Sequence, residues 1–200
     1  TRDGYYLEGL YTDSGLTNKL ADTYKVTDNV TVYTKWSKLV DLSEDVNTLI
    51  TNSNKSATTF VMNDNGDNSI GVVFNNANIK FANSGFIGIP SPQQAYYDIV
   101  DILEELQSNS DYKSVVISNG NSSHDIELVG TNLNDWTNLL VMARFLSELG
   151  GYGYSGSQVS SVTAGDLAGK QLKVTITLKD GSVSENGNQT ETYYLDFSTK

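Results

Sequence analysis

The sequence predicts an α+β fold, in which a small β-rich opening segment precedes a mainly antiparallel sheet with about three helices. Three observations support this prediction. Short segments of alternating apolar and polar residues, typical of half-buried strands, are separated by turn-forming Asn, Gly, Asp and Ser. Three longer segments carry apolar residues at helical spacing. A change in composition after Trp36 predicts two domains, residues 1–36 and residues 37–200.

The opening segment contains two predicted strands. Residues 5–7 suit one strand, and the alternation that runs from Val30 through Val32 to Trp36 suits the other. Asp-Ser-Gly at residues 13–15 favours a turn between them.

The same segment resembles a known bacterial repeat. The stretches GYYLEGLYTDSGLTNK (residues 4–19) and VTDNVTVYTKW (residues 26–36) are similar to the C-terminal half of a Listeria–Bacteroides repeat, the B-repeat type of internalin-like surface proteins. Leu10 stands where the repeat usually has Trp, and the repeat's first strands would lie before Thr1. The resemblance implies a truncated β-grasp-like module of a secreted or surface-anchored protein, acting as a stalk or weak binding unit without enzymatic activity. Residues 37–200 carry no recognised family signature.

The tyrosines of the opening segment have two candidate roles. A module this small buries little surface, so we expect its aromatic residues to supply most of its core. The alternative is that Tyr5, Tyr6 or Tyr11 stacks on a glycan ring.

Two helices are predicted in the first half of the larger region. Residues 37–52 carry apolar residues at helical spacing, with Ser43 as the expected N-cap. Residues 91–108 begin with Ser91 as N-cap and Pro92 in the first turn, and Gln follows at the third helical position as in a capping box.

The third predicted helix covers residues 134–151, starting at Asn134 and ending at the Gly150–Gly151 pair. It is apolar on nearly every side between residues 139 and 146. We therefore expect it to be the most buried helix, with Leu140 in the core.

The remaining apolar segments are predicted strands, joined mostly by hairpin turns such as the Asn-Gly pairs. They cover residues 58–62, 70–74, 79–81, 113–118, 124–129, 171–178 and 190–197.

The candidate catalytic residues are few. Four acids of the second helix, which we expect on its solvated face, could in principle supply a glycosidase carboxylate pair: Asp98, Asp101, Glu104 and Glu105. His124 is the only histidine, and we interpret it as an exposed residue at a strand end. We predict no catalytic residues and no cofactor.

A metal site is also not expected. Without cysteine, the chain can form neither disulfides nor thiolate sites. The segment from Asn63 to Ser69 offers Asp64 and Asp67 as weak calcium ligands, but their spacing does not match an EF-hand loop. A plain hairpin turn is the favoured interpretation.

The charge distribution argues against two partner classes. Residues 1–36 hold four Lys or Arg against five Asp or Glu, a net charge of −1, and residues 37–200 hold nine against nineteen, a net charge of −10. Nucleic acid and anionic membrane surfaces repel such a chain. No apolar run approaches the roughly 18–20 residues of a membrane span, so membrane insertion is not expected.

The leading candidate for a ligand contact is the loop GYGYSGS at residues 151–157, in which Tyr152 and Tyr154 offer flat rings with hydroxyl groups on a glycine-rich backbone. The alternative is that both rings close the core.

Three functions remain open. We expect a non-catalytic adhesion or binding module of a bacterial cell-surface or secreted protein, with a host or cell-wall protein or glycan as partner. The alternatives are an accessory or catalytic domain of an extracellular carbohydrate- or peptide-active enzyme, and a structural spacer.

Overall fold

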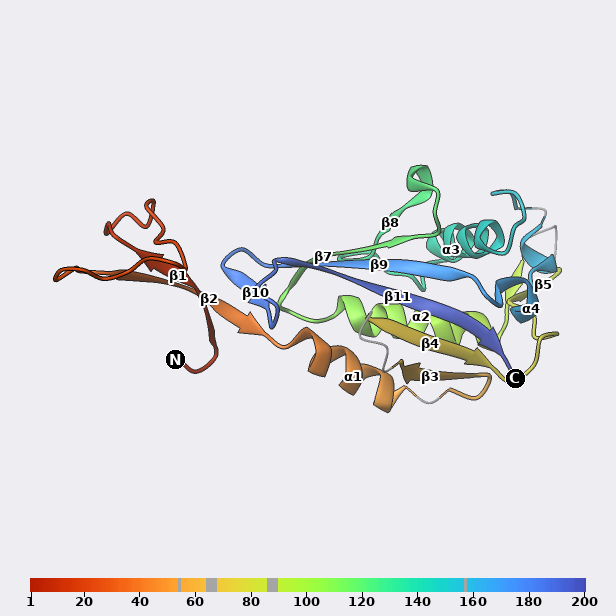
Figure 1. Cartoon of the computed structure of the whole chain (residues 1–200). Coiled ribbons are helices and arrows are strands. Elements are labelled where there is room, and N and C mark those ends of the chain that lie inside the picture. The colour runs from red at the N-terminus through yellow and green to blue at the C-terminus, as the bar shows by residue number, and fades with distance from the viewer. Residues whose placement is uncertain (54, 64–67, 86–89, 157) are drawn as a thin grey trace.

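The computed structural model describes residues 1–53, 55–63, 68–85, 90–156 and 158–200. It confirms the predicted α+β class (Figure 1). The strands are β1 (Tyr5–Tyr11), β2 (Tyr33–Val40), β3 (Thr58–Met62), β4 (Ser69–Phe74), β5 (Ala82–Asn83), β6 (Ser91–Pro92), β7 (Tyr112–Ser118), β8 (Ile126–Glu127), β9 (Gln171–Leu178), β10 (Ser182–Ser184) and β11 (Thr190–Thr199). The α-helices are α1 (Leu42–Asn52), α2 (Gln94–Gln107), α3 (Trp136–Leu149) and the short α4 (Ala164–Leu167), and 3₁₀ turns lie at Ser122–His124 and Val159–Ser161.

The described strands form three sheets. The main sheet has the order β3-β4-β11-β9-β7-β8, a smaller sheet has the order β1-β2-β10, and β5 pairs with β6. Two neighbouring pairs, β2–β10 and β4–β11, are parallel, and the other pairs are antiparallel. The prediction of a mainly antiparallel sheet is therefore confirmed.

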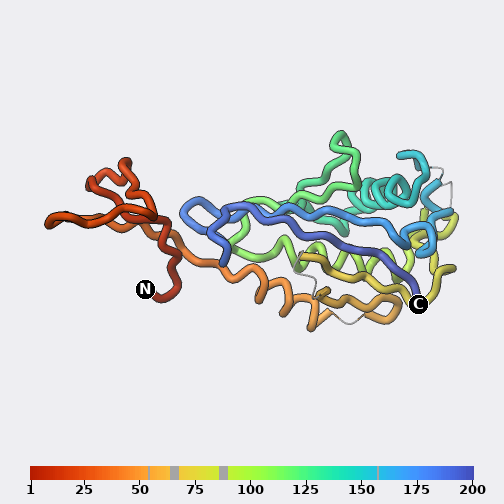
Figure 2. The backbone as a smooth tube through the Cα atoms, in the orientation of Figure 1, coloured from red at the N-terminus to blue at the C-terminus, as the bar shows by residue number. Residues whose placement is uncertain are grey.

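The β1–β2 hairpin projects from one end of the molecule, as the backbone trace shows (Figure 2). The strand β2 continues without a break through the boundary predicted after Trp36, and its last three residues pair with β10. The predicted boundary therefore falls inside a strand. The apolar residues Val30 and Val32, predicted to belong to this strand, precede it and are exposed.

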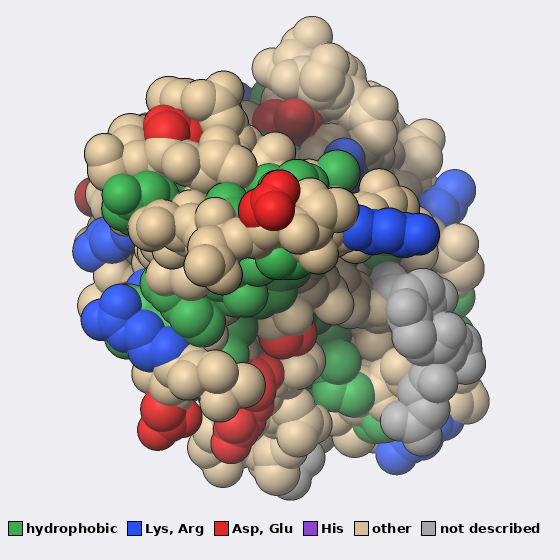
Figure 3. Space-filling model, turned by 60° about the vertical axis from the view of Figure 1, so that its left-hand side comes forward, with side chains coloured by type: hydrophobic (Ala, Val, Ile, Leu, Met, Phe, Trp, Pro, Cys, Tyr) green, Lys and Arg blue, Asp and Glu red, His purple; other side chains and the backbone are tan. Residues whose placement is uncertain are grey.

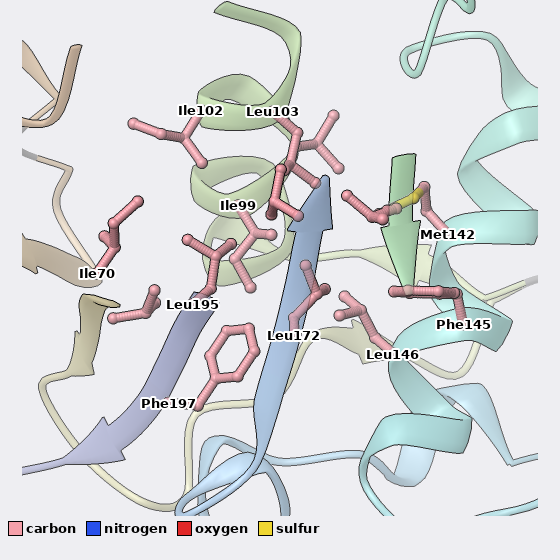
Figure 4. Close-up of a cluster of buried hydrophobic side chains, with 14 of the residues drawn as sticks. Ile70, Ile99, Ile102, Leu103, Met142, Phe145, Leu146, Leu172, Leu195 and Phe197 are labelled. Atoms are coloured by element: carbon pink, nitrogen blue, oxygen red, sulfur yellow. The ribbon is translucent and has the colours of Figure 1, made fainter. Parts of the chain in front are cut away.

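The main sheet buries one face beneath helices. On β9, Leu172, Val174, Ile176 and Leu178 are buried and alternate with more exposed residues. Figure 4 shows side chains of α2 and α3 pointing toward this face, where Leu172 and Leu195 lie between them. The core of the body is thus a single layer of apolar side chains between helices and sheet.

The helix starts differ from those predicted. Asp41 rather than Ser43 is the N-cap of α1, because its carboxylate accepts the Glu44 N–H at 3.0 Å. The predicted capping box of α2 does not form, since residues 91–92 make the strand β6 and the helix begins at Gln94. Asp135 rather than Asn134 caps α3. In both α1 and α3 the cap is an Asp within two residues of the predicted cap, and its carboxylate accepts a first-turn N–H.

Two burial predictions are wrong. Helix α2 buries seven residues and α3 buries six, and Leu140 is only half-buried. Asp98, predicted on the solvated face of α2, has 0% exposure. Its side-chain oxygens accept the Ala57 N–H at 3.2 Å and the Gln94 side-chain N–H at 2.8 Å, and these bonds compensate part of the cost of burying a polar group.

Candidate functional site

The predicted loop after α3 is held at two points. The ring of Tyr154 stacks on His124, with 3.8 Å between centroids and 14° between planes. The Tyr152 hydroxyl donates to the Asp166 carboxylate at 3.3 Å, and that carboxylate raises the pKa of Tyr152. Both tyrosines are partly buried and pack against the core. The structure therefore places the two residues in separate clusters rather than in one shared surface.

The cluster around Tyr154 is centred on a carboxylate. Glu148 accepts hydrogen bonds at 2.9 Å from the side-chain amides of both Asn119 and Asn121, and its carboxylate lies 2.8 Å from Nδ1 of His124. His124 lies in a 3₁₀ turn with 29% side-chain exposure, so its prediction as an exposed strand-end residue is wrong. These bonds attach the segment between β7 and β8 to α3. We interpret the cluster as structural, holding this segment in place.

Replacing Glu148 with Gln is expected to lower the free energy of unfolding by about 1.5–3 kcal/mol at pH 7, because Gln turns an NH₂ group toward donors. Burial alone would raise the pKa of Glu148, but hydrogen bonds from Asn119, Asn121 and His124 outweigh it and hold the pKa below its ordinary value of 4.5. The stabilisation is therefore full above pH 4.5 and is lost as the pH falls through the lower folded-state pKa.

Urea unfolding at pH 7 and at acid pH measures this difference. We expect the difference in the free energy of unfolding between wild type and Glu148→Gln to be smaller at acid pH. Asp125→Asn is the control, because Asp125 is adjacent in sequence to His124 and exposed. A gap that does not change with pH would show that the Glu148 charge does not stabilise the fold.

The weak calcium candidates Asp64 and Asp67 lie outside the described residues. Among the residues that the structure describes, no group of three or more His, Cys, Asp or Glu could hold a metal ion. Nor is any helix within those ranges long and apolar enough to cross a membrane.

A pocket of about 630 Å³ lies where the projecting hairpin meets the body of the protein. Its size is within the range of small-ligand sites. We call it the root pocket, and its lining residues are Tyr6, Glu8, Lys19, Lys35, Trp36, Ser37, Gly181, Ser182, Val183, Gly187 and Gln189.

The register of β1 and β2 explains which side chains share the face at the root pocket. Tyr6 lies opposite Ser37, and Gly9 lies opposite Lys35 after a bulge at Glu8. Residues directly opposite each other on an antiparallel pair point to the same face. Glu8 accepts hydrogen bonds from Lys35 and Ser37, which places all three side chains on this face together with Tyr6.

The charged groups on this face, Glu8 and Lys35, are held in place by hydrogen bonding to each other. The hydrogen bond from Lys35, followed by that from Ser37, holds the pKa of Glu8 below its ordinary value, so the carboxylate is ionised at neutral pH. Gly187 has φ +79°, and a methyl group there would lie 2.5 Å from the Tyr6 hydroxyl oxygen. The glycine therefore lets the half-buried Tyr6 ring lie against the β10–β11 turn.

The hairpin does not bury the aromatic core predicted for the opening segment. Among its tyrosines Tyr11 is buried, whereas Tyr5 and Tyr33 are each 40% exposed. Of the ten large hydrophobic residues exposed in the described ranges, eight lie in residues 5–33: Tyr5, Leu7, Leu10, Tyr24, Val26, Val30, Val32 and Tyr33. With the hairpin end turned forward, Figure 3 shows hydrophobic side chains at the surface between charged ones.

The residues of the root pocket were only partly accessible to prediction. Tyr6 was a candidate from its position in an aromatic strand, but Glu8, Lys35 and Ser37 were missed. A register for β1 and β2 would have brought them together, because Lys35 and Ser37 alternate on one strand. Gln189 and Gly187 come from a turn near the other end of the chain, and no local signal connects them to β1.

Comparison of the chain with family models, with curated protein sequences and with solved structures gives no match.

Proposed function

We propose that this chain is a non-catalytic binding module of a secreted or cell-surface bacterial protein, and that its root pocket binds a glycan. The extracellular assignment is based on the sequence resemblance of residues 1–36 and on the low proportion of charged residues, 18%. The binding assignment is based on one observation. A half-buried tyrosine, Tyr6, lies beside the hydrogen-bonded Glu8–Lys35 pair in a pocket of small-ligand size.

The chemistry of the root pocket suits a hydroxyl-rich ligand. The Tyr6 ring offers an apolar face on which a sugar ring can pack, and its hydroxyl group can hydrogen-bond. Glu8 accepts hydrogen bonds, Lys35 donates them, and Ser37 does both. Glu8 and Lys35 balance each other and Lys19 adds one positive charge to the lining, so the pocket disfavours cationic ligands.

Replacing Tyr6 with Ala is expected to weaken glycan binding about tenfold or more, because the packing face for the sugar ring is removed. The measurement is binding of the 200-residue chain to a panel of immobilised neutral oligosaccharides, including β-linked glucose and N-acetylglucosamine oligomers. Gly187→Ala is a second variant. Its methyl group would displace the Tyr6 ring, so this variant is also expected to weaken glycan binding.

Tyr154→Ala is the control, because Tyr154 belongs to the Glu148 cluster and not to the root pocket. Loss of binding in Tyr154→Ala with binding kept in Tyr6→Ala would move the site to the loop after α3. If the wild-type chain binds none of the oligosaccharides, the glycan assignment is wrong.

A further inference from the structure

A second cavity, of about 880 Å³, adjoins the root pocket. It is lined by β1 and by residues 19–32 of the connection that leads to β2. This connection lies beside the outer end of β1, where the Leu20 N–H donates to the Leu10 carbonyl at 2.8 Å and Tyr11 pairs with Lys19. Since β1 is the last strand of its sheet, the cavity lies along the edge of the sheet, and we call it the edge cavity.

The edge cavity is continuous with the root pocket. Tyr6, Glu8 and Lys19 line both of them. Each cavity alone is within the size range of small-ligand sites. A ligand that lies on Tyr6 in the root pocket and extends past this ring therefore enters the edge cavity.

The edge cavity differs from the root pocket in chemistry, because exposed apolar side chains line it. Clusters of exposed apolar residues mark sites of interaction. Six of the ten large hydrophobic residues exposed in the described ranges line this one cavity: Leu7, Leu10, Tyr24, Val26, Val30 and Val32. Five of these six are branched aliphatic residues, and Tyr24 is the aromatic one.

We propose that the two cavities together bind one amphiphilic ligand, a saccharide that carries a hydrocarbon chain, as in a glycolipid. The sugar lies in the root pocket, and the chain packs on the Leu and Val side chains of the edge cavity. Burial of the chain removes apolar surface of both ligand and protein from water, which strengthens binding. The position of the sugar rests on the proposed function, and the edge cavity adds the chain.

The same lining argues against a longer saccharide that fills both cavities. Each sugar hydroxyl that leaves water needs a hydrogen-bond partner. The root pocket provides such partners in Glu8, Lys35, Ser37 and Gln189. The polar residues that line only the edge cavity are Asp22, Asp28 and Asn29, all exposed residues of the connection. A hydrocarbon chain has no hydroxyl group to satisfy, so it suits the aliphatic lining better.

Calorimetric titration of the 200-residue chain with pairs of glycosides tests this proposal. The probes are the methyl and hexyl β-glycosides of cellobiose and of N,N′-diacetylchitobiose, below the concentration at which the hexyl compounds form micelles. Within a pair the sugar is the same and only the chain grows. We expect the hexyl glycoside to bind at least about tenfold tighter than the methyl glycoside, with a more negative change in heat capacity.

Variants assign the two parts of the ligand to the two cavities. Leu7→Ser is expected to reduce the ratio of hexyl to methyl affinity at least about threefold and to leave the methyl glycoside unchanged. Val32→Ser is the second variant, because Val32 precedes β2 and its substitution does not alter a strand. Tyr6→Ala should weaken both glycosides. Val61→Ser is the matched control, since Val61 is 47% exposed on β3 and does not line either cavity.

Three results would overturn the proposal. Equal affinity of the wild-type chain for the methyl and hexyl glycosides would exclude the chain site and leave the glycan function standing. Tighter binding of the phenyl than of the hexyl glycoside would replace the hydrocarbon chain with an aromatic group. If triethylene glycol monohexyl ether, which lacks a sugar, binds as tightly as the hexyl glycosides, the sugar assignment fails as well.

The failure of the two proposals can thus be told apart. The methyl glycosides and the immobilised oligosaccharides report on the root pocket alone. The ratio of hexyl to methyl affinity reports on the edge cavity alone.

Discussion

Phe74→Ala is expected to lower the free energy of unfolding by about 3–5 kcal/mol. The Phe74 side chain is fully buried at the end of β4. Its ring stacks on Phe197 with 5.9 Å between centroids, and it meets Phe81 edge-on at 5.3 Å. The substitution removes both aromatic contacts and leaves a cavity between two rigid rings, which cannot easily collapse.

Urea unfolding monitored by circular dichroism measures this loss. Val61→Ala on the neighbouring strand is the control, because its exposed side chain should change stability by about 0.5 kcal/mol or less. A loss below about 1 kcal/mol for Phe74→Ala would mean that Phe81 and Phe197 repack to fill the space.

Leu146→Ala is expected to cost about 2–5 kcal/mol, and Leu140→Ala on the same helix about 1 kcal/mol. Leu146 is 1% exposed and points from α3 into the layer between α2 and β9 (Figure 4). Leu140 is half-buried and lines a small apolar pocket with Trp136 and Ala143. Removing Leu146 leaves an enclosed cavity, whereas water can fill the space left by Leu140.

The pair is a matched comparison, because both substitutions remove the same atoms from one helix. The urea concentration at the unfolding midpoint should be clearly lower for Leu146→Ala than for Leu140→Ala. The dependence of the free energy of unfolding on urea concentration should be the same for both. Equal losses for the two variants would show that Leu140 is covered in solution, contrary to the structure.

The main sheet was predictable where one face is buried. Leu172, Val174, Ile176 and Leu178 alternate with polar residues in the sequence, and β9 occupies residues 171–178 as predicted. Alternation specifies a strand strongly when only one face meets the core. The buried Asp98 was not predictable, because its partner Ala57 lies 41 residues away and the helical pattern alone assigns an acid to the solvent.

The candidate sites were predictable only in part. The sequence identifies Tyr152 and Tyr154 as neighbours in one loop, but their partners Asp166 and His124 come from different elements. The exposure of the hairpin was also not foreseen. Alternation indicates that a strand has an apolar face, and it does not say whether the fold provides a layer to cover it.

The order of strands in the main sheet has a consequence for biosynthesis. Its interior strand β11, which lies between β4 and β9, is formed by residues 190–199, after every other strand of the sheet has left the ribosome. Without β11, no strand joins the β3–β4 hairpin to β9, because β11 pairs with both β4 and β9. The sheet therefore cannot be completed until the last strand has been synthesised. Its assembly depends on contacts between residues distant in sequence, which are slow to form. The nascent polypeptide is expected to stay open until residues 190–199 emerge.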